Sequence, residues 1–339
     1  MEELKYNEDG FRDYLVSSKD SAFVLDLSKN TMIECIEEMC KIKSGSHPGI
    51  EHNYRILIKK LKLIESKFGC TIYPSMISSV FWNHFVPFLV GQNLKYSTVK
   101  FLKANLIAVL NWSSKYGVKL NPSYNEVDIP NYISGKIALT PDEISHIYHF
   151  ILGAKKFYSF RLKKEVMYRK NKLKTMDKVR DMFVLGCNLG QRYSDLVRIG
   201  PDNFKKGQFS IVQQKTGNRC AMNINAMSIE SQVVWEILEK YDYKAPYTGD
   251  INNFNTNLHE LLFNIGEGFL EDVHIENKIN GVIVRETKKK YQLISSHSAR
   301  RSFATINTLR NISRGKILRA TGHSSEKAFN RYICYDEDS

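Results

Sequence analysis

The sequence predicts a mainly α-helical protein of two domains, of which the second is an α+β domain with a small antiparallel sheet. Three observations predict this fold class. The chain has 339 residues, which is more than one typical core needs. Residues 121–139 contain two prolines and no helical period, so they predict a linker. Apolar residues before the linker recur at helical spacing, whereas after it a glycine turn separates two short β-prone segments.

The first domain is expected to be a small helical bundle. Residues 51–68 place apolar side chains at mostly helical spacing on a basic background, and residues 75–92 and 97–117 also predict helices. We assign residues 46–130 to this bundle. A short acidic N-terminal segment, residues 1–45, precedes it, and the linker proper occupies residues 131–139.

The second domain, residues 140–339, is expected to open on a helix. Thr140 is a predicted N-cap, Pro141 suits the first helical position and Glu143 completes a capping box. Further on, QFSIVQQ and RCAMNI flank KTGN as a predicted hairpin, and another β segment is expected around VIVRE. The predicted helices cover residues 141–153, 177–190, 227–241, 254–264, 297–310 and 313–320.

The charge of the chain favours a polyanionic partner. Lys and Arg number 49 against 36 Asp and Glu, and residues 1–50 hold 6 of the basic and 10 of the acidic residues, so the excess lies in the later domains. The six cysteines form no CxxC pair, which is typical of a reducing cytoplasm. No stretch approaches the roughly 18 apolar residues of a membrane span. We therefore expect a cytoplasmic protein that crosses no membrane.

Two segments of the second domain carry candidate cations. In LGCNLGQRYSDLVRI a helix is expected to end near Gly190, and Arg192 just beyond it would offer a bidentate fork to a phosphate, held in place by Asp195. In QQKTGN, Lys215 lies at the predicted hairpin tip, where an ammonium could reach a bound duplex and act as a charge or proton donor. Taken singly, each of these residues is also typical of an ordinary surface.

The C-terminal part adds two histidines, an arginine and a phenol. His297 and Arg300 in SSHSARRSFAT share one face of a helix whose N-terminus itself favours an anion. His323 and Tyr332 follow in ATGHSSEKAFNRYICYD. With the two cations above, this set suits attack on a phosphodiester, because cations stabilise the transition-state charge while the tyrosine acts as nucleophile. No carboxylate cluster accompanies the set, so we expect neither a metal nor a cofactor.

The order and spacing of these boxes resemble the tyrosine recombinase (phage integrase) family. The residues that match its six catalytic positions, in the family's order, are Arg192, Lys215, His297, Arg300, His323 and Tyr332. The sequences of the motifs HSARRSFAT and TGHSSEKAFNRYI are most similar to those of integrases from Bacteroides-type bacteria and their mobile elements. The residue after Arg300 departs from many relatives, since it is Arg301 rather than histidine.

The resemblance implies a role for each position. The residues that would bind the scissile phosphate are Arg192, Arg300 and His323. His297 would assist by hydrogen bonding and proton transfer, and Lys215 would be the general acid for the 5′-hydroxyl leaving group. Tyr332 would form a 3′-phosphotyrosyl link that needs neither ATP nor metal, and Asp195 would support Arg192.

The resemblance also implies site-specific DNA recombination, for integration, excision or inversion of a mobile element. A helical, SAM-like core-binding domain and the catalytic domain would clamp double-stranded DNA, and a homotetramer would assemble on two DNA sites. A host DNA-bending factor or an excisionase would be a further partner. Candidate phosphate contacts are Lys59, Lys60, Lys62 and the basic run at residues 161–174.

Other interpretations stay open at this level. A type IB topoisomerase uses nearly the same catalytic set and relaxes DNA as a monomer, and an inactive relative would bind DNA without a covalent adduct. Tyr335 lies one helical turn from Tyr332 and competes as nucleophile, although the nine-residue interval from His323 favours Tyr332. His146 and His149 form a weak zinc pattern, because no third ligand lies nearby at a recognisable spacing.

Overall fold

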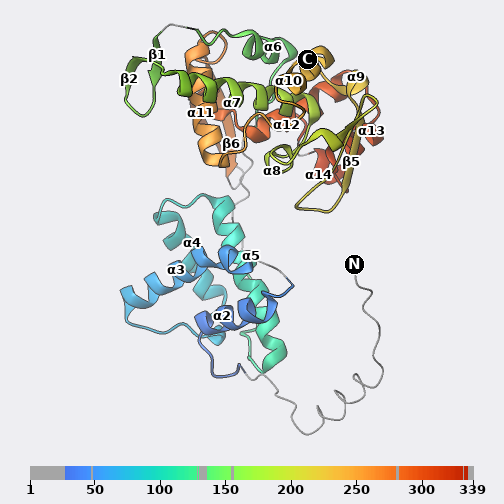
Figure 1. The fold of residues 1–339 in the computed structure, drawn as a ribbon. Helices are drawn as coiled ribbons and strands as arrows, with labels where there is room; N and C mark the ends of the chain where they lie inside the picture. Colours follow the sequence, from blue (N-terminus) through green and yellow to red (C-terminus); the bar gives the residue numbers. More distant parts are fainter. Residues whose placement is uncertain are drawn as a thin grey trace, which may run out of the picture. The chain divides into compact units, whose positions relative to one another are not determined.

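The computed structural model describes residues 27–46, 49–127, 129, 136–153, 156–279, 282–330 and 332–334. The chain divides into two compact units (Figure 1). The first, here called the helical unit, comprises Met1–Ile133 and is grouped with Lys278–Val282; the second, the mixed unit, comprises Ser134–Asn277 and Ile283–Ser339. Most of the expected acidic segment and most of the expected linker lie outside the described residues.

The helical unit consists of four longer helices around one apolar core. They are α2 (Met32–Lys43), α3 (Ile50–Phe68), α4 (Ser79–Gly91) and α5 (Tyr96–Ser113), joined by the short turns η1 (Pro74–Met76) and η2 (Ser114–Tyr116). Thr31 and Glu34 form a capping box at the start of α2, and Gly69 ends α3 in the left-handed conformation. Met32 and Ile36 of α2 are completely buried in the core. The bundle therefore includes residues 32–43, ahead of the expected boundary at residue 46.

The helices of the mixed unit pack around a central pair. Its elements are α6 (Pro141–His149), α7 (Lys170–Leu189), α8 (Tyr193–Leu196), η3 (Pro201–Asn203), α9 (Ile224–Met227), α10 (Ser231–Lys240), α11 (Ile251–Ile265), η4 (Lys290–Leu293), α12 (Ser296–Leu309), α13 (Arg314–Thr321) and α14 (Glu326–Asn330). The central pair is α7 and α12, with α6, α10 and α11 around them (Figure 1). A Cβ at Gly186 of α7 would lie 3.2 Å from the Cβ of Ala299, so small residues let the central helices approach closely.

Three small sheets complete the mixed unit. Strands β3 (Phe204–Lys205), β4 (Gln208–Val212) and β5 (Arg219–Asn223) form an antiparallel sheet in chain order, which confirms the predicted hairpin. Strands β1 (Lys156–Ser159) and β2 (Lys164–Met167) form a second antiparallel pair, and β6 (Asp272–Ile279) pairs with β7 (Val282–Lys289). The mainly helical fold with a small antiparallel sheet is as predicted.

Two element boundaries differ from the prediction for identifiable reasons. Helix α6 ends at His149 rather than at residue 153, because Phe150 has an extended backbone with ψ of 120°. Helix α7 begins at Lys170, seven residues earlier than predicted. Its first turns are rich in Lys and Asn and bury little, so they show no apolar period until Met176.

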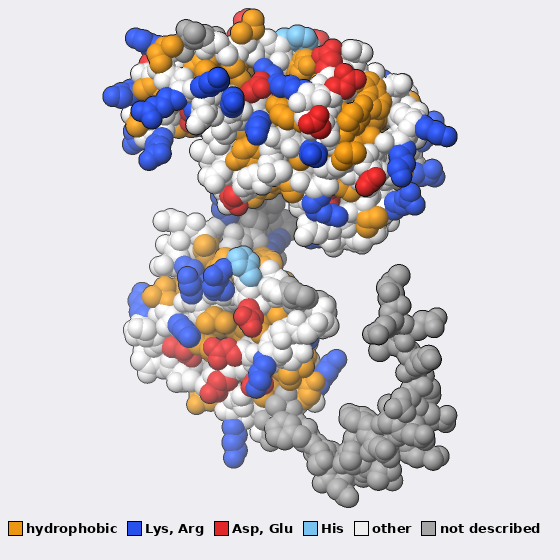
Figure 2. Space-filling model, in the orientation of Figure 1, with side chains coloured by type: hydrophobic (Ala, Val, Ile, Leu, Met, Phe, Trp, Pro, Cys, Tyr) orange, Lys and Arg blue, Asp and Glu red, His pale blue; other side chains and the backbone are white. Residues whose placement is uncertain are grey.

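Exposed basic side chains gather around β1, β2 and the start of α7 (Figure 2). The described exposed cations of this stretch are Lys156, Arg161, Lys163, Lys164, Arg169, Lys170 and Lys174. All of them except Lys156 belong to the basic run at residues 161–174, which the sequence singled out as candidate phosphate contacts. No helix in the described part of the chain is both long and apolar enough to span a membrane.

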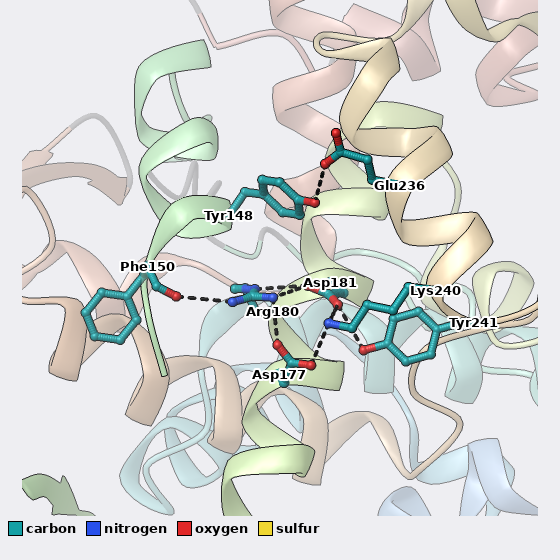
Figure 3. Close-up of polar contacts among 8 residues, drawn as sticks. All are labelled: Tyr148, Phe150, Asp177, Arg180, Asp181, Glu236, Lys240 and Tyr241. Carbon is teal, nitrogen blue, oxygen red and sulfur yellow. Dashed lines mark hydrogen bonds and ion pairs between the residues drawn. The ribbon is translucent and has the colours of Figure 1, made fainter. Parts of the chain in front are cut away.

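An ionic cluster ties α7 to α6 and α10 (Figure 3). Asp181 of α7 is completely buried and binds Arg180 at 2.8 Å, Lys240 at 2.7 Å and the Tyr241 hydroxyl at 2.9 Å. Arg180 Nη1 also donates to the Phe150 carbonyl at 3.1 Å. Burial, reinforced by the Asp181 carboxylate, raises the pKa of Tyr241, so the phenol stays a proton donor. The cluster fixes the helix whose C-terminal end leads into the candidate site.

Candidate functional site

Arg192 is presented by a tight turn at the end of α7. Gly190 ends the helix with φ of 66°, and a Cβ there would lie only 2.4 Å from the Phe303 ring. A side chain at this position would therefore clash with the central helix as well as strain the backbone. Arg192 follows as the N-cap of α8 in an extended conformation, and its Nη1 donates a short hydrogen bond to Gln213 Oε1. The turn thus directs the guanidinium toward the β4–β5 hairpin.

Arg300 is a completely buried cation on α12. Its Nη1 donates to the Gly190 carbonyl at 2.9 Å, and its Nη2 donates to the Thr321 carbonyl at 2.5 Å. Its Nε has no hydrogen-bond partner among the described residues, and no carboxylate there forms an ion pair with it. Burial, followed by the neighbouring charge of Arg192, lowers the pKa of Arg300, but an arginine stays protonated. A buried cation with an unused donor provides a strong site for an anion.

His323 lies beside Arg300 with its tautomer set by hydrogen bonds. Arg300 Nη2 lies 3.2 Å from His323 Nε2, and an arginine can only donate, so Nε2 accepts. The proton is then on Nδ1, which lies 2.8 Å from Thr321 Oγ1, while that hydroxyl donates to the Ile317 carbonyl at 2.7 Å. Burial and the charges of Arg300 and Arg192 lower the pKa of His323 to about 3. The ring is therefore neutral at neutral pH.

Tyr332 lies at the centre of this cluster. Its ring centroid is 4.5 Å from that of His323 and 4.9 Å from that of His297, and Arg300 Cζ lies 5.4 Å from it. The half-buried tyrosine follows α14, whose Phe329 is completely buried and accepts a hydrogen bond from the Tyr332 amide at 2.7 Å. Phe329 thus anchors the short helix that brings the phenol to the cations. Tyr335 lies outside the described residues.

His297 is on the rim of the cluster, at the first turn of α12. Part of its ring faces solvent, yet the surrounding protein displaces enough water to lower its pKa to about 4. The positive charges of Arg301, Arg300, Arg192 and Lys136 reinforce this effect. The ring is therefore neutral at neutral pH and can accept a proton from the nearby phenol, while the lowered pKa makes it a weak base.

Lys215 is the one candidate cation that the structure does not bring into contact with the cluster. It lies on the turn between β4 and β5, is exposed, and forms no hydrogen bond or ion pair with any residue that the structure describes. The base of its turn is closed by backbone hydrogen bonds of Gln213 to Asn218 and Gly217, both at 2.9 Å. The lysine side chain is free to change rotamer above this fixed base.

A hollow of about 630 Å³ opens beside Arg192 and His297. Its lining includes the polar side chains Arg192, Ser194, Arg198, Gln214, Ser296 and His297. The arginines and the N-terminal turn of α12 make this hollow favourable for an anionic group. It shares Arg192 and His297 with the site.

The comparisons with known proteins report a similarity of fold. No family model and no curated protein sequence matches the chain. Among solved structures, a lambda integrase dimer bound to a COC′ core site matches with a TM-score of 0.57 and 16% identity over 88% of this chain and 97% of that one. The chain has the tyrosine recombinase fold.

Two further structures with the tyrosine recombinase fold match over similar lengths. The Tn1549 transposon integrase in complex with transposon right end DNA matches with a TM-score of 0.58 and 12% identity, over 90% of this chain and 95% of that one. The XerH site-specific recombinase bound to a palindromic difH substrate matches with a TM-score of 0.56 and 14% identity, over 98% and 86%. The tyrosine recombinase fold thus covers both units of the chain.

The structure changes the expected role of Asp195. The carboxylate is completely buried, but it does not bind the Arg192 side chain. Its Oδ1 accepts from the Gln214 amide at 2.8 Å and lies 3.4 Å from Arg198 Nη1, while its Oδ2 has no partner among the described residues. Asp195 therefore fixes the base of the Lys215 turn, and the direct support of Arg192 comes from Gln213.

Gln213 and Thr321 belong to the site although the sequence did not single them out. Gln213 has 1% exposure at the end of β4, and its side chain contacts both Arg192 and the Thr321 carbonyl. Thr321 contributes its carbonyl to Arg300 and its hydroxyl to His323. A signal existed in both cases, because each is a polar residue within a motif that the sequence did identify, namely QQKTGN and ATGHSSEKAFNRYICYD.

The zinc interpretation of His146 and His149 finds no support in the geometry. His149 Nδ1 lies 2.9 Å from the Ser145 carbonyl, and the His146 ring lies against Phe269. Within the part of the chain that the structure describes, no group of three or more His, Cys, Asp or Glu side chains is placed to hold a metal ion.

Proposed function

We propose that the protein is a site-specific DNA recombinase of the tyrosine recombinase family, which cuts and rejoins DNA strands through a 3′-phosphotyrosyl intermediate. The observation that carries the proposal is the position of Tyr332 between His323, His297 and the buried Arg300, whose Nε lacks a partner among the described residues. A phenol beside a buried, unsatisfied cation is suited to attack on an anionic centre.

A phosphodiester fits the charge and hydrogen-bonding capacity of this site. Arg192 and Arg300 supply fixed positive charge, and in a complex with DNA the Arg300 Nε would donate to a non-bridging oxygen. The two guanidiniums take the part that a metal ion plays in other phosphoryl-transfer sites, because both neutralise the charge that develops on the non-bridging oxygens.

In the proposed reaction the Tyr332 oxygen attacks the scissile phosphorus. The Tyr332 Oη–P bond forms, the P–O5′ bond breaks, and the phenolic proton passes to the neutral His297 ring. Lys215 donates a proton to the departing O5′, which leaves as a hydroxyl. The phosphotyrosyl ester retains the energy of the original bond, so attack by a 5′-hydroxyl of the partner strand reverses each step without ATP.

The proposal requires Lys215 to approach the site when DNA is bound. Its exposed position above a fixed hairpin base supports such an approach, since only the side chain and the turn residues need to move. A lysine with no partner among the described residues has no interaction to break before it reaches the leaving group.

We further propose double-stranded DNA as the substrate and a homotetramer on two DNA sites as the active assembly. The net charge of +13 and the structural neighbours, whose names describe complexes with core-site, transposon-end and difH DNA, support this proposal. We propose more specifically that the protein integrates, excises or inverts a mobile element of Bacteroides-type bacteria. The reaction would take place in the cytoplasm with a host DNA-bending factor or an excisionase.

The test is capture of a covalent protein–DNA adduct. A pool of duplexes with a randomised 30-bp centre and a nick at a fixed position traps the intermediate, because the short strand released by cleavage diffuses away. We expect an SDS-resistant adduct with the wild type and none with Tyr332→Phe. Sequencing the trapped duplexes identifies the preferred site.

Tyr335→Phe is the matched control, because it removes the same hydroxyl three residues away. We expect this variant to form the adduct, and the reverse result would make Tyr335 the nucleophile. Two intact duplexes with the recovered site should then yield exchanged products. Relaxation of supercoiled plasmid that lacks the site, without exchanged products, would instead indicate a type IB topoisomerase.

A further inference from the structure

Gln213 uses both ends of its side-chain amide within the site. Its Oε1 accepts the short hydrogen bond from Arg192 Nη1 and another from Thr216 Oγ1 at 3.0 Å. Its Nε2 donates to the Thr321 carbonyl at 2.8 Å and lies 3.4 Å from Gln191 Oε1. With 1% of its surface exposed, Gln213 contacts no bulk solvent that could replace these partners.

The Thr321 carbonyl connects this amide to the second arginine. The same oxygen accepts from Gln213 Nε2 and from Arg300 Nη2, at 2.8 and 2.5 Å. A continuous series of hydrogen bonds therefore runs from Arg192 through Gln213 and Thr321 to Arg300. The positive charge of Arg192 lowers the pKa of Arg300, because the two cations repel each other. The neutral acceptors Gln213 and the Thr321 carbonyl must therefore hold the two guanidiniums close together.

The surroundings of Gln213 allow one orientation of the amide. A Cβ at Gly322, which has φ of 66°, would lie 2.7 Å from both Cδ and Oε1 of Gln213. The amide is packed against this glycine, which blocks its movement on that side. Exchange of the amide oxygen and nitrogen would place a donor against Arg192 and an acceptor against the Thr321 carbonyl, which is unfavourable at both ends.

We propose that Gln213 is a positioning residue that holds the Arg192 guanidinium at a set distance from Arg300, and that it acts on the transition state through Arg192. This inference rests on the proposed function. Phosphoryl-transfer sites depend on preorganised cations, and small displacements of such groups reduce rates by orders of magnitude. The Lys215 turn also contacts this amide through Thr216 Oγ1, but its base is closed by backbone hydrogen bonds that do not use the Gln213 side chain.

The first test is single-turnover cleavage of the nicked duplex recovered from the adduct pool. Gln213→Met keeps the length of the side chain and removes its polar atoms. We expect its cleavage rate to fall about 10- to 100-fold while its affinity for the duplex stays within about twofold. The amide of Gln213→Asn is too short to reach both partners, so its cleavage rate should lie between those of the wild type and Gln213→Met. This variant replaces Gln213→Met in the test if the Met variant folds poorly.

A double-mutant cycle tests whether Gln213 acts through Arg192. We expect Gln213→Met to change the rate by less than about twofold in an Arg192→Ala background, because the group that it positions is already absent. A loss in that background as large as in the wild type would overturn the inference, as would a single variant that cleaves at the wild-type rate.

The leaving group separates an effect on Arg192 from an effect on Lys215. A 5′-bridging phosphorothioate leaves as a thiolate and needs no general acid, so it should restore cleavage by Lys215→Ala. It should not restore cleavage by Gln213→Met, because the contribution of Arg192 to charge stabilisation is still lost. Restoration of the Gln213 variant would assign Gln213 to the lysine turn and contradict the inference.

Asn188→Ala is the matched control for lost stability. Asn188 is also buried; its side chain donates to the Val184 carbonyl at 2.9 Å and accepts from the Glu230 amide at 2.9 Å, and neither partner is a site residue. We expect its thermal unfolding temperature to fall while its cleavage rate stays near that of the wild type. Absence of any adduct with the wild-type protein would overturn the proposed function itself, and this inference with it.

Discussion

The helical unit and the mixed unit bury different kinds of side chain. Among the described residues of the helical unit, Ser113 is the one buried polar side chain, and the core is otherwise apolar. The mixed unit buries the charged groups Asp181, Asp195, Glu260 and Arg300 together with several amides and hydroxyls. Many of these polar groups lie around Tyr332 or on the helices and hairpin that support it. The interior of the mixed unit therefore positions the polar groups of the candidate site in addition to stabilising the fold.

Such an arrangement has a thermodynamic consequence. Burial of a charge that lacks an ion-pair partner opposes folding, whereas burial of apolar area favours it. The helical unit can therefore be expected to gain stability from every core residue. The mixed unit retains at least one residue, Arg300, whose burial is unfavourable until an anion binds.

Substitutions in the two cores should have opposite effects: one should lower the cleavage rate and the other the free energy of unfolding. Arg300→Met should reduce cleavage by at least about 10³-fold but change the free energy of unfolding by less than about 1.5 kcal/mol, because the lost hydrogen bonds are offset by removal of a buried charge. Leu57→Ala in the helical unit should cost about 2–5 kcal/mol and leave the cleavage rate of the folded protein unchanged. Urea unfolding and single-turnover cleavage measure the two quantities.

A large loss of stability in the Arg300 variant, comparable with that of Leu57→Ala, would contradict this comparison. It would mean that the hydrogen bonds of Arg300 to Gly190 and Thr321 outweigh the cost of burying its charge. Arg300 would then contribute mainly to the stability of the fold.

The second prediction concerns acid. His323 has a pKa of about 3 in the folded protein and an ordinary value near 6.5 when unfolded, so the unfolded chain binds more protons between these values. Its contribution to stability is complete above pH 6.5 and decreases as the pH falls, by about 2 kcal/mol at pH 5. Unfolding of His323→Gln should show a correspondingly weaker pH dependence between pH 7 and pH 5.

Bound DNA should oppose that effect, because a phosphate near His323 favours the protonated ring. The affinity for the recovered duplex should therefore rise as the pH falls from 7 to 5, and more for the wild type than for His323→Gln. An affinity with the same pH dependence in both proteins would show that His323 does not face the phosphate.

The smallest expected effect belongs to the surface of the helical unit. Lys59 is exposed on α3 with no partner among the described residues, so it is a candidate phosphate contact. Lys59→Ala should weaken DNA binding a few-fold and reduce the slope of log affinity against log salt by about one unit. Lys41→Ala is the control, because Lys41 already lies 3.5 Å from Glu38. Equal salt slopes for all three proteins would remove α3 from the DNA interface.

Local pattern was sufficient for much of the fold. The capping box at Thr140, the helical spacing of residues 51–68 and the glycine turn of the β4–β5 hairpin all depend on residues close together in the chain, and the structure agrees with each. Strands β1 and β2 were missed, because their charged residues show no clear alternation and their pairing is supported by α11: Asn264 accepts from the Tyr158 amide at 2.6 Å. The acidic charge of residues 1–45 hides helix α2, whose buried apolar face belongs to the bundle.

Residue types and their order along the chain were enough to identify the candidate side chains. The packing of distant segments was needed to show that Arg300 is buried beside Tyr332, that Asp195 supports the hairpin rather than Arg192, and that Gln213 joins the two arginines. The physical reason is that residue type limits which hydrogen bonds a side chain can make, whereas the choice of partner depends on which distant segments packing brings within about 3 Å.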